Sequence, residues 1–303
     1  MSWEYGAGTH VGRVRQQNED CYHADPDSGL WLVADGMGGR QAGEVASAII
    51  TEFIPVALKQ GTSLPESVGR SHQAVLAELE KGRGVAGMGS TAVVLQMKDD
   101  DYEIAWVGDS RAYLWNGELH PLTRDHTVVQ RLLEAGAIDA QQAREHPHRS
   151  SLIQALGSTE IAGVEVETIK GTLSHGEQIL LCSDGLTSEV SDEQIAGILN
   201  EPLNAQEKVD QLIQAALDNG GKDNVTVLLI SATSGEPSLS DTIPLDRIRA
   251  VEKTIPIDRS AQLASNRTRS RTQSVHSTWF WVGLALAVTA GLVVLIRWLS
   301  LNL

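Results

Sequence analysis

Three apolar runs in this chain each end at an aspartate that stands next to a glycine. The runs cover residues 30–34, 104–107 and 179–182, and they lead into Asp35-Gly36, Gly108-Asp109 and Ser183-Asp184-Gly185. Short apolar runs bounded by turn residues are typical of buried strands. A carboxylate at a strand end has a fixed backbone, and the neighbouring glycine leaves room for a small ligand to approach.

Two further acidic motifs accompany these strand ends. Residues 15–20 read Arg-Gln-Gln-Asn-Glu-Asp, and residues 221–224 read Gly-Lys-Asp-Asn. Several carboxylates that converge on one point repel one another strongly unless a divalent cation lies between them. Hard oxygen ligands with no accompanying His/Cys cluster favour Mg²⁺ or Mn²⁺ over zinc. The sequence therefore predicts a magnesium or manganese site.

Taken in order, the five motifs resemble those of the metal-dependent protein phosphatases, the PPM family of type 2C serine/threonine phosphatases, and particularly its compact bacterial members. The resemblance extends over residues 3–232, and residues 89–92 and 122–126 also look like the linking motifs of that family. It implies an enzyme that hydrolyses phosphoserine and phosphothreonine in proteins. A catalytically silent, phosphoprotein-binding adaptor on the same fold is the alternative.

Local patterns predict an α+β fold. Helical apolar spacing occurs at 43–59, 66–80 and 204–218, and Ser191 to Gln194 reads as a capping box. Strands are expected at 91–97, 102–107, 111–115 and 225–230, with a hairpin turn at Asn116-Gly117. Antiparallel hairpins flanked by helices fit a four-layer α-β-β-α sandwich with two central antiparallel sheets, which the resemblance also implies.

The resemblance assigns metal ligands to the carboxylates. Asp35 is expected to bridge two Mn²⁺ or Mg²⁺ ions, with the Gly36 carbonyl on the second ion. Asp184 and Asp223 would complete the shell of the first ion, and Asp109 would share a third, weaker ion with Asp184. Two such ions hold and activate a water and clamp the phosphoryl oxygens.

Other residues are expected to assist around the metals. Arg15 can hold the substrate phosphate in a bidentate fork, which makes it a catalytic candidate together with Asp35 and Asp184. Glu19 and Asp20 are expected to orient metal-bound waters. Met37 stands where animal members of the family often have a histidine proposed as general acid. A metal-bound water or His126 remains as the candidate proton donor.

The first 234 residues form the expected phosphatase domain, with a polar flap at about 126–158 that suits substrate selection.

The charge is unevenly distributed along the chain. Of the 24 basic residues, 8 follow residue 234, and of the 39 acidic residues, 5 follow it. The net charge is therefore −18 up to residue 234 and +3 after it. A strongly acidic domain is a poor nucleic-acid binder. The N-terminus has no secretory signal pattern, which favours a cytoplasmic enzyme.

The C-terminal region carries a second signal. Residues 279–296 are 18 residues without a charge, which as a helix would span about 27 Å. We expect a single-pass transmembrane helix at 279–298, with a short tail to 303. Arg267, Arg269 and Arg271 precede it and only Arg297 follows, so the positive-inside rule keeps the enzyme at the cell membrane on the cytoplasmic side.

Residues 235–278, rich in Ser, Thr and Arg, are expected to be a disordered linker. Within it, residues 242–247 (Thr-Ile-Pro-Leu-Asp-Arg) and 254–259 (Thr-Ile-Pro-Ile-Asp-Arg) differ at one position. Thr242 and Thr254 could be phosphorylated by a partner serine/threonine kinase and captured by a phosphothreonine-binding domain. A coincidental repeat is the alternative.

Overall fold

Two antiparallel sheets pack face to face in the computed structural model, which describes residues 3–38, 42–82, 84, 87–159, 164–232 and 249–254. One sheet has the order β1 (Trp3–His10), β11 (Val225–Ala232), β10 (Gln178–Cys182), β7 (Arg111–Trp115), β8 (Leu119–Pro121). The other has the order β12 (Arg249–Thr254), β9 (Val166–Thr172), β6 (Asp101–Val107), β5 (Ala92–Lys98), β3 (Leu30–Met37), β2 (Asp20–Asp25), and β4 (Gly89–Ser90) pairs with β3.

The main core lies between the two sheets. Successive side chains of a strand point to opposite faces, so Leu95 of β5 and Ile104 and Trp106 of β6 face the sheet that contains β10 and β11, where they meet Leu181 and Leu228. These side chains are at most 1% exposed. Burial of this much apolar surface is the dominant favourable contribution to folding, and it holds the two sheets at a fixed distance.

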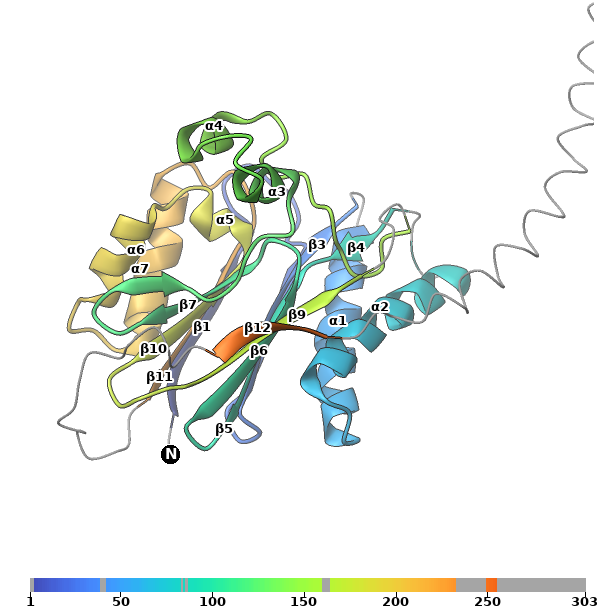
Figure 1. Ribbon diagram of the computed structural model, residues 1–303, viewed down its shortest axis with the longest axis horizontal. Helices are drawn as coiled ribbons and strands as arrows, with labels where there is room; N and C mark the ends of the chain where they lie inside the picture. Colours follow the sequence, from blue (N-terminus) through green and yellow to red (C-terminus); the bar gives the residue numbers. More distant parts are fainter. Residues whose placement is uncertain are drawn as a thin grey trace, which may run out of the picture. The chain divides into compact units, whose positions relative to one another are not determined.

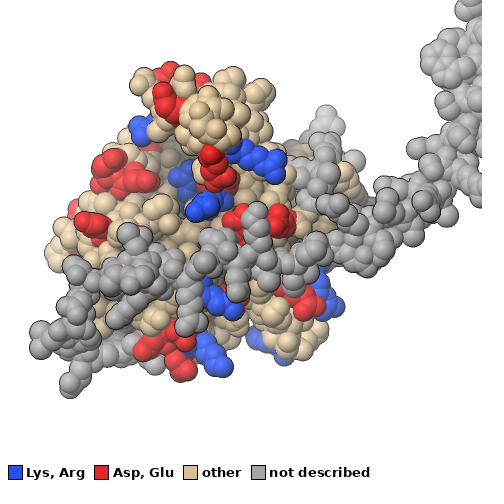
Figure 2. Space-filling view, viewed as in Figure 1, with Lys and Arg blue, Asp and Glu red and all other residues tan. Residues whose placement is uncertain are grey.

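Helices cover the outer face of each sheet, as Figure 1 shows. Figure 2 gives the same view in space-filling form, with both acidic and basic side chains on the visible face. The helices α1 (Ala42–Lys59) and α2 (Leu64–Glu80) contact the sheet that contains β3, whereas α7 (Ala205–Asp218) packs on β1 and β11. The short helices α5 (Asp184–Thr187) and α6 (Asp192–Leu199) lie on the same side as α7 (Figure 1). The predicted four-layer α-β-β-α sandwich is therefore confirmed.

Several local predictions also hold. Ser191 and Gln194 form the expected capping box at the start of α6, and the predicted helix at 204–218 is α7, with Asn204 as its N-cap. The Asn116-Gly117 turn joins β7 to β8, and Gly117 has the positive φ of +102° that favours glycine there. The helix caps and the hairpin turn therefore form at the residues that the sequence indicates.

The expected flap, about 126–158, contains more regular structure than its polar sequence suggested. It forms α3 (Val128–Glu134) and α4 (Ala140–Glu145), which lie at one end of the sandwich in Figure 1. A capping box of Asp139 and Gln142 opens α4, and Thr127 caps α3. Thr and Asp are favoured N-cap residues, so both helix starts have a local signal in the sequence.

The structure also describes six residues within the range 235–278, for which we expected no regular structure. Residues Arg249–Thr254 form β12, which pairs antiparallel with β9 and places Thr254 opposite Val166. The expectation of disorder is therefore wrong for these six residues. The rest of that range and the expected membrane helix at 279–298 lie outside the described residues, and no described helix is long and apolar enough to cross a membrane.

Candidate active site

The predicted carboxylates come from both sheets and meet at one end of the sandwich. Asp35 lies near the end of β3, Asp109 lies in the connection from β6 to β7, and Asp184 begins α5 directly after β10. Asp223 precedes β11, and Asp20 is the first residue of β2. Because the strands are antiparallel and in register, these strand ends and strand starts share one edge of the fold.

Asp35 occupies the centre of this edge. It lies directly opposite Asp20 in the β2–β3 register, and its backbone N–H donates to the Thr91 hydroxyl over 3.1 Å while its carbonyl accepts from the Thr91 N–H over 2.8 Å. The next residue, Gly36, has no space for a side chain, since a Cβ there would collide with the backbone carbonyls of Gly43 and Glu19. The close backbone approach explains the glycine after Asp35.

Asp20 is buried, with only 5% of its surface exposed. Its Oδ2 accepts hydrogen bonds from the hydroxyls of Ser183 (2.8 Å) and Thr226 (2.7 Å), whereas its buried Oδ1 has no protein partner. A buried carboxylate oxygen without a partner is costly. Asp20 Oδ1 is therefore available to accept a hydrogen bond from a water beside Asp35, the residue opposite in the β2–β3 register.

Asp223 forms the site's contact with Arg15. One guanidinium nitrogen of Arg15 donates to Asp223 Oδ2 over 2.7 Å, and about half of the Arg15 side chain is exposed (51%). Asn224 fixes this corner, because its side chain accepts from the Glu19 N–H and donates to the carbonyls of Val11 and Gln17. Arg15 and Glu19 are thus brought beside the carboxylates.

Asp109 lies on a tightly constrained connection. Gly108 has a φ of +106°, and a Cβ there would collide with the Thr91 side chain, so glycine is required. The Thr91 hydroxyl also bonds the Ser110 hydroxyl over 2.7 Å. Thr91 therefore joins the Asp35 strand to the Asp109 loop.

The carboxylates perturb one another. Burial raises the pKa of Asp35 well above its ordinary value, and Asp20 and Asp184 raise it further. Burial likewise raises the pKa of Asp109 well above its ordinary value, with Asp184 contributing. The pKa of Asp184 rises to about 6 and that of Asp20 to about 7, in both cases chiefly through burial. Such clustered, perturbed acids mark functional sites.

A divalent cation fits this donor set. Within the described ranges, no three His, Cys, Asp or Glu side chains are gathered closely enough to enclose a metal ion as they stand. The carboxylates of Asp184 and Asp35 are nevertheless within hydrogen-bond reach of each other. A small side-chain rotation changes which of these carboxylates converge, whereas their burial is set by the strands that carry them. Two buried carboxylates in contact need a shared proton or a cation.

His126 does not have the environment of a general acid. Its ring is 4% exposed, its Nδ1 accepts from the Gly108 N–H over 3.1 Å, and its Nε2 lies 3.6 Å from Glu167 Oε1. The ring also stacks on Trp106. Both ring nitrogens therefore face protein, and the geometry argues against proton donation to a substrate.

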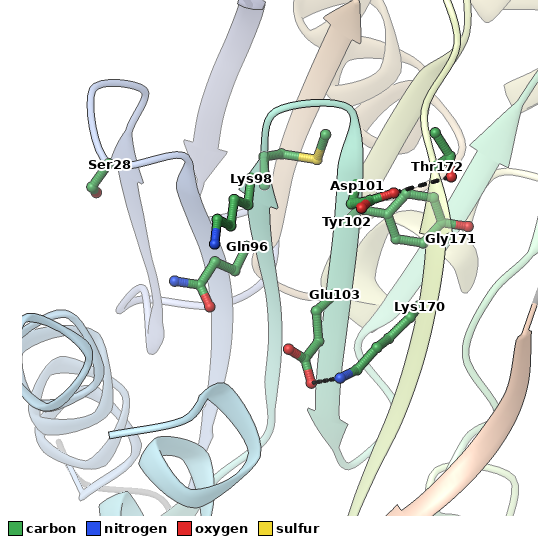
Figure 3. Close-up of a pocket in the computed structure, with 10 residues that line it drawn as sticks. Ser28, Gln96, Lys98, Asp101, Tyr102, Glu103, Lys170, Gly171 and Thr172 are labelled. Carbon is green, nitrogen blue, oxygen red and sulfur yellow. Dashed lines mark hydrogen bonds and ion pairs between the residues drawn. The ribbon is translucent and has the colours of Figure 1, made fainter. Parts of the chain in front are cut away.

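A cavity of about 480 Å³ is lined by none of the site carboxylates, and Figure 3 draws the residues that line it. It is lined by the end of β5, the start of β6 and the end of β9, including Lys98, Asp101 and Lys170. In Figure 3 the Lys170 and Glu103 side chains approach each other, and their charged groups are 3.4 Å apart. Since Asp101 begins β6 and Asp109 follows its end, this cavity is at the opposite end of the sheet from the candidate active site.

Comparison with known proteins agrees with this geometry. A family model described as Protein phosphatase 2C matches residues 7–228. The Serine/threonine phosphatase stp of Listeria welshimeri is 36% identical over 237 residues, which cover 73% of this chain and 93% of that protein.

Solved structures give the same result. The serine/threonine phosphatase PstP/Ppp of Mycobacterium tuberculosis superimposes with a TM-score of 0.70 at 35% identity, covering 77% of this chain and 100% of that chain. The catalytic domain of PstP in complex with 2 manganese ions superimposes with a TM-score of 0.68 at 34% identity, covering 77% of this chain and 99% of that chain.

Proposed function

The chain belongs to the protein phosphatase 2C family of metal-dependent serine/threonine phosphatases, and we propose that it removes phosphate from phosphoserine and phosphothreonine in proteins. The observation that carries this proposal is the convergence of buried carboxylates from both sheets beside the half-exposed Arg15. The fold brings these groups together from positions more than 200 residues apart in the chain.

The site would hold manganese. The carboxylates of Asp35, Asp184 and Asp223 and the Gly36 carbonyl are the donors for two ions, and Asp109 with Asp184 would hold a third. When bound, the ions lower the pKa of a water and stabilise the charge on the phosphoryl oxygens. A relative with 2 manganese ions, at 34% identity, supports this choice of metal. Magnesium is the other hard cation that the oxygen ligands would accept.

The protein's own groups bind and orient the substrate. Arg15 has a planar guanidinium with five N–H donors, so it can hold a phosphate while it stays near Asp223. Asp20, fixed by Ser183 and Thr226, presents its unpartnered Oδ1 to a water. Met37 has no acidic proton and His126 is enclosed, so we propose that water protonates the leaving alkoxide.

A turnover assay tests this function and separates an enzyme from a silent phosphoprotein-binding adaptor. We expect the chain to hydrolyse p-nitrophenyl phosphate and a phosphothreonine peptide only when Mn²⁺ is added, with no turnover in EDTA. Asp35→Asn should lose the activity, and the exposed Asp27→Asn should keep it. Binding of the phosphopeptide by the wild-type chain without any Mn²⁺-dependent turnover would contradict the proposal and favour the adaptor.

We also propose that residues 279–298 anchor the enzyme in the cell membrane with the catalytic domain in the cytoplasm. The support is the uncharged run of 18 residues at 279–296, flanked by Trp279, Trp281 and Trp298 and preceded by three arginines. Tethering would raise the effective concentration of the enzyme at membrane-bound phosphoproteins. Such substrates would include the products of a serine/threonine kinase whose action the phosphatase opposes.

The near-repeat at Thr242 and Thr254 supports a further proposal, a phosphothreonine-dependent partner. Thr254 is the last residue of β12, and its backbone lies opposite Val166 of β9. Incubation of the Asp35→Asn chain with serine/threonine kinases, followed by phosphosite mapping, tests the proposal. If neither threonine is modified, and changing both to alanine leaves partner capture unaltered, the repeat is only a spacer.

A further inference from the structure

The segment at residues 122–126 lies alongside residues 106–112, the stretch that carries Asp109. Five hydrogen bonds join the two: Trp106 Nε1 to the Arg124 carbonyl (2.9 Å), Gly108 N–H to His126 Nδ1 (3.1 Å), His126 N–H to the Gly108 carbonyl (2.9 Å), Ala112 N–H to Thr123 Oγ1 (3.0 Å) and Leu122 N–H to the Ala112 carbonyl (2.8 Å). These bonds fix the backbone on both sides of Asp109.

An ion pair between Arg111 and Asp125 joins the same two segments. Arg111 donates from Nε to Asp125 Oδ1 over 2.9 Å and from Nη2 to Asp125 Oδ2 over 2.7 Å, and its Nη1 donates to the Tyr113 hydroxyl over 3.0 Å. A bidentate pair fixes orientation as well as distance. The side chains are 33% and 16% exposed.

The ion pair of Arg13 and Asp218 provides a comparison within the same chain. It has a single contact of 2.9 Å, and its side chains are 56% and 61% exposed. Exposed pairs of this kind contribute little to stability. Arg111 and Asp125 therefore form the more constrained pair, and Arg111 is only two residues from Asp109.

The position of the pair relative to Asp109 also matters. Asp109 is buried, with 8% of its surface exposed, and it lies two residues before Arg111 in the chain. All three guanidinium nitrogens of Arg111 are engaged by Asp125 and Tyr113, which leaves the Asp109 oxygens for another cation.

We propose that Arg111 and Asp125 are positioning residues that hold Asp109 in the orientation in which it binds a metal ion. The inference rests on the proposed function, since it takes Asp109 as a metal ligand. A purely structural role, in which the pair only braces β7 against the segment at residues 122–126, is the competing explanation. The two differ in whether the effect of the pair passes through Asp109.

The test is a double-mutant cycle in the full-length chain. Arg111→Lys keeps the positive charge and removes the planar fork. It is combined with Asp109→Asn, and Arg13→Lys serves as the matched control on an exposed pair. Mn²⁺ binding is measured by titration calorimetry, and the Mn²⁺ concentration for half-maximal p-nitrophenyl phosphate hydrolysis is measured in parallel. Thermal unfolding in EDTA checks that each variant is folded.

We expect Arg111→Lys to weaken the weakest Mn²⁺ binding step about tenfold, with the KM for p-nitrophenyl phosphate within twofold of wild type. Arg13→Lys should leave both quantities within twofold. Asp109→Asn should abolish that binding step, and adding Arg111→Lys to Asp109→Asn should change Mn²⁺ binding no further. If Arg111→Lys does not fold, Asp125→Asn replaces it in the same cycle.

Two results would overturn the inference. One is a folded Arg111→Lys protein that binds Mn²⁺ as wild type does. The other is an equal loss of Mn²⁺ affinity in the presence and absence of the Asp109 carboxylate, which would show that the pair acts on the fold as a whole. A wild-type chain that binds Mn²⁺ without hydrolysing phosphoesters would contradict the proposed function, and the calorimetric cycle would still decide the role of Arg111.

Discussion

Without metal ions, this protein should lose stability as the pH rises from about 4 to about 7. The buried Asp20 has its pKa raised from 3.8 to about 7 in the folded state. The folded chain therefore binds a proton more tightly than the unfolded chain, and stability is fully present below pH 3.8 and lost as the pH rises through 7. This sign is opposite to that of a carboxylate stabilised by an ion pair.

The magnitude follows from the same values. Between pH 5 and pH 8, Asp20 alone should reduce the free energy of unfolding by about 2 to 3 kcal/mol. For a domain of this size, that is a fall in melting temperature of about 5–10 °C. Asp184, with its pKa raised to about 6, acts in the same direction. Saturating Mn²⁺ at about 100 times its dissociation constant should add about 2.7 kcal/mol per ion.

The assay is differential scanning calorimetry of the full-length chain from pH 5 to pH 8, with EDTA or with Mn²⁺. In EDTA the melting temperature should fall across this range, and Mn²⁺ should raise it most at pH 8, where the carboxylates are ionised. Asp27→Asn, a change at an exposed carboxylate, should leave both profiles unchanged. A melting temperature in EDTA that stays level or rises from pH 5 to pH 8 would refute the reasoning.

Three other changes should have distinct effects. Asp35→Asn should abolish turnover and most of the Mn²⁺-induced rise in melting temperature, and near-normal turnover would contradict the two-metal assignment. Arg15→Lys should raise the KM for p-nitrophenyl phosphate about tenfold, because a planar guanidinium fork is replaced by a point charge. Calorimetry should show unchanged Mn²⁺ binding in this variant. An unaltered KM would show that Arg15 does not bind the phosphate. Deleting residues 279–303 should release the protein from membranes, as sedimentation would show. Turnover of a small phosphoester should stay unchanged in the same hydrolysis assay. A truncated protein that still pelleted with membranes would exclude this segment as the anchor.

Local chemistry in the sequence was sufficient for much of the fold. The apolar runs before Asp35, Asp109 and Asp184 are strands because short apolar segments between turn residues bury both faces in a sandwich. The capping box at Ser191 and the turn at Gly117 likewise depend on neighbours within a few residues. For these features the determining contacts are local, so the sequence carries them directly.

The acidic motifs in the sequence identified the candidate carboxylates but not their hydrogen-bond partners. That Arg15 bonds Asp223, 208 residues away in the sequence, and that Asp20 accepts from Ser183 and Thr226, depends on how the two sheets meet. No periodicity or spacing encodes such contacts. Only the packing of the sheets decides which motif residues touch, and in what geometry.

His126 and Arg111 show most clearly which roles of a side chain could not be predicted from the sequence. A histidine in a family-like motif beside the flap was a reasonable candidate for a general acid, but the fold turns its Nδ1 to the Gly108 N–H and encloses the ring. Nothing in the sequence distinguishes Arg111 from other strand residues, yet the tertiary structure places it in a bidentate ion pair with Asp125. The sequence determines which chemical groups are available, whereas burial and long-range packing decide which of them face the substrate and which hold the others in place.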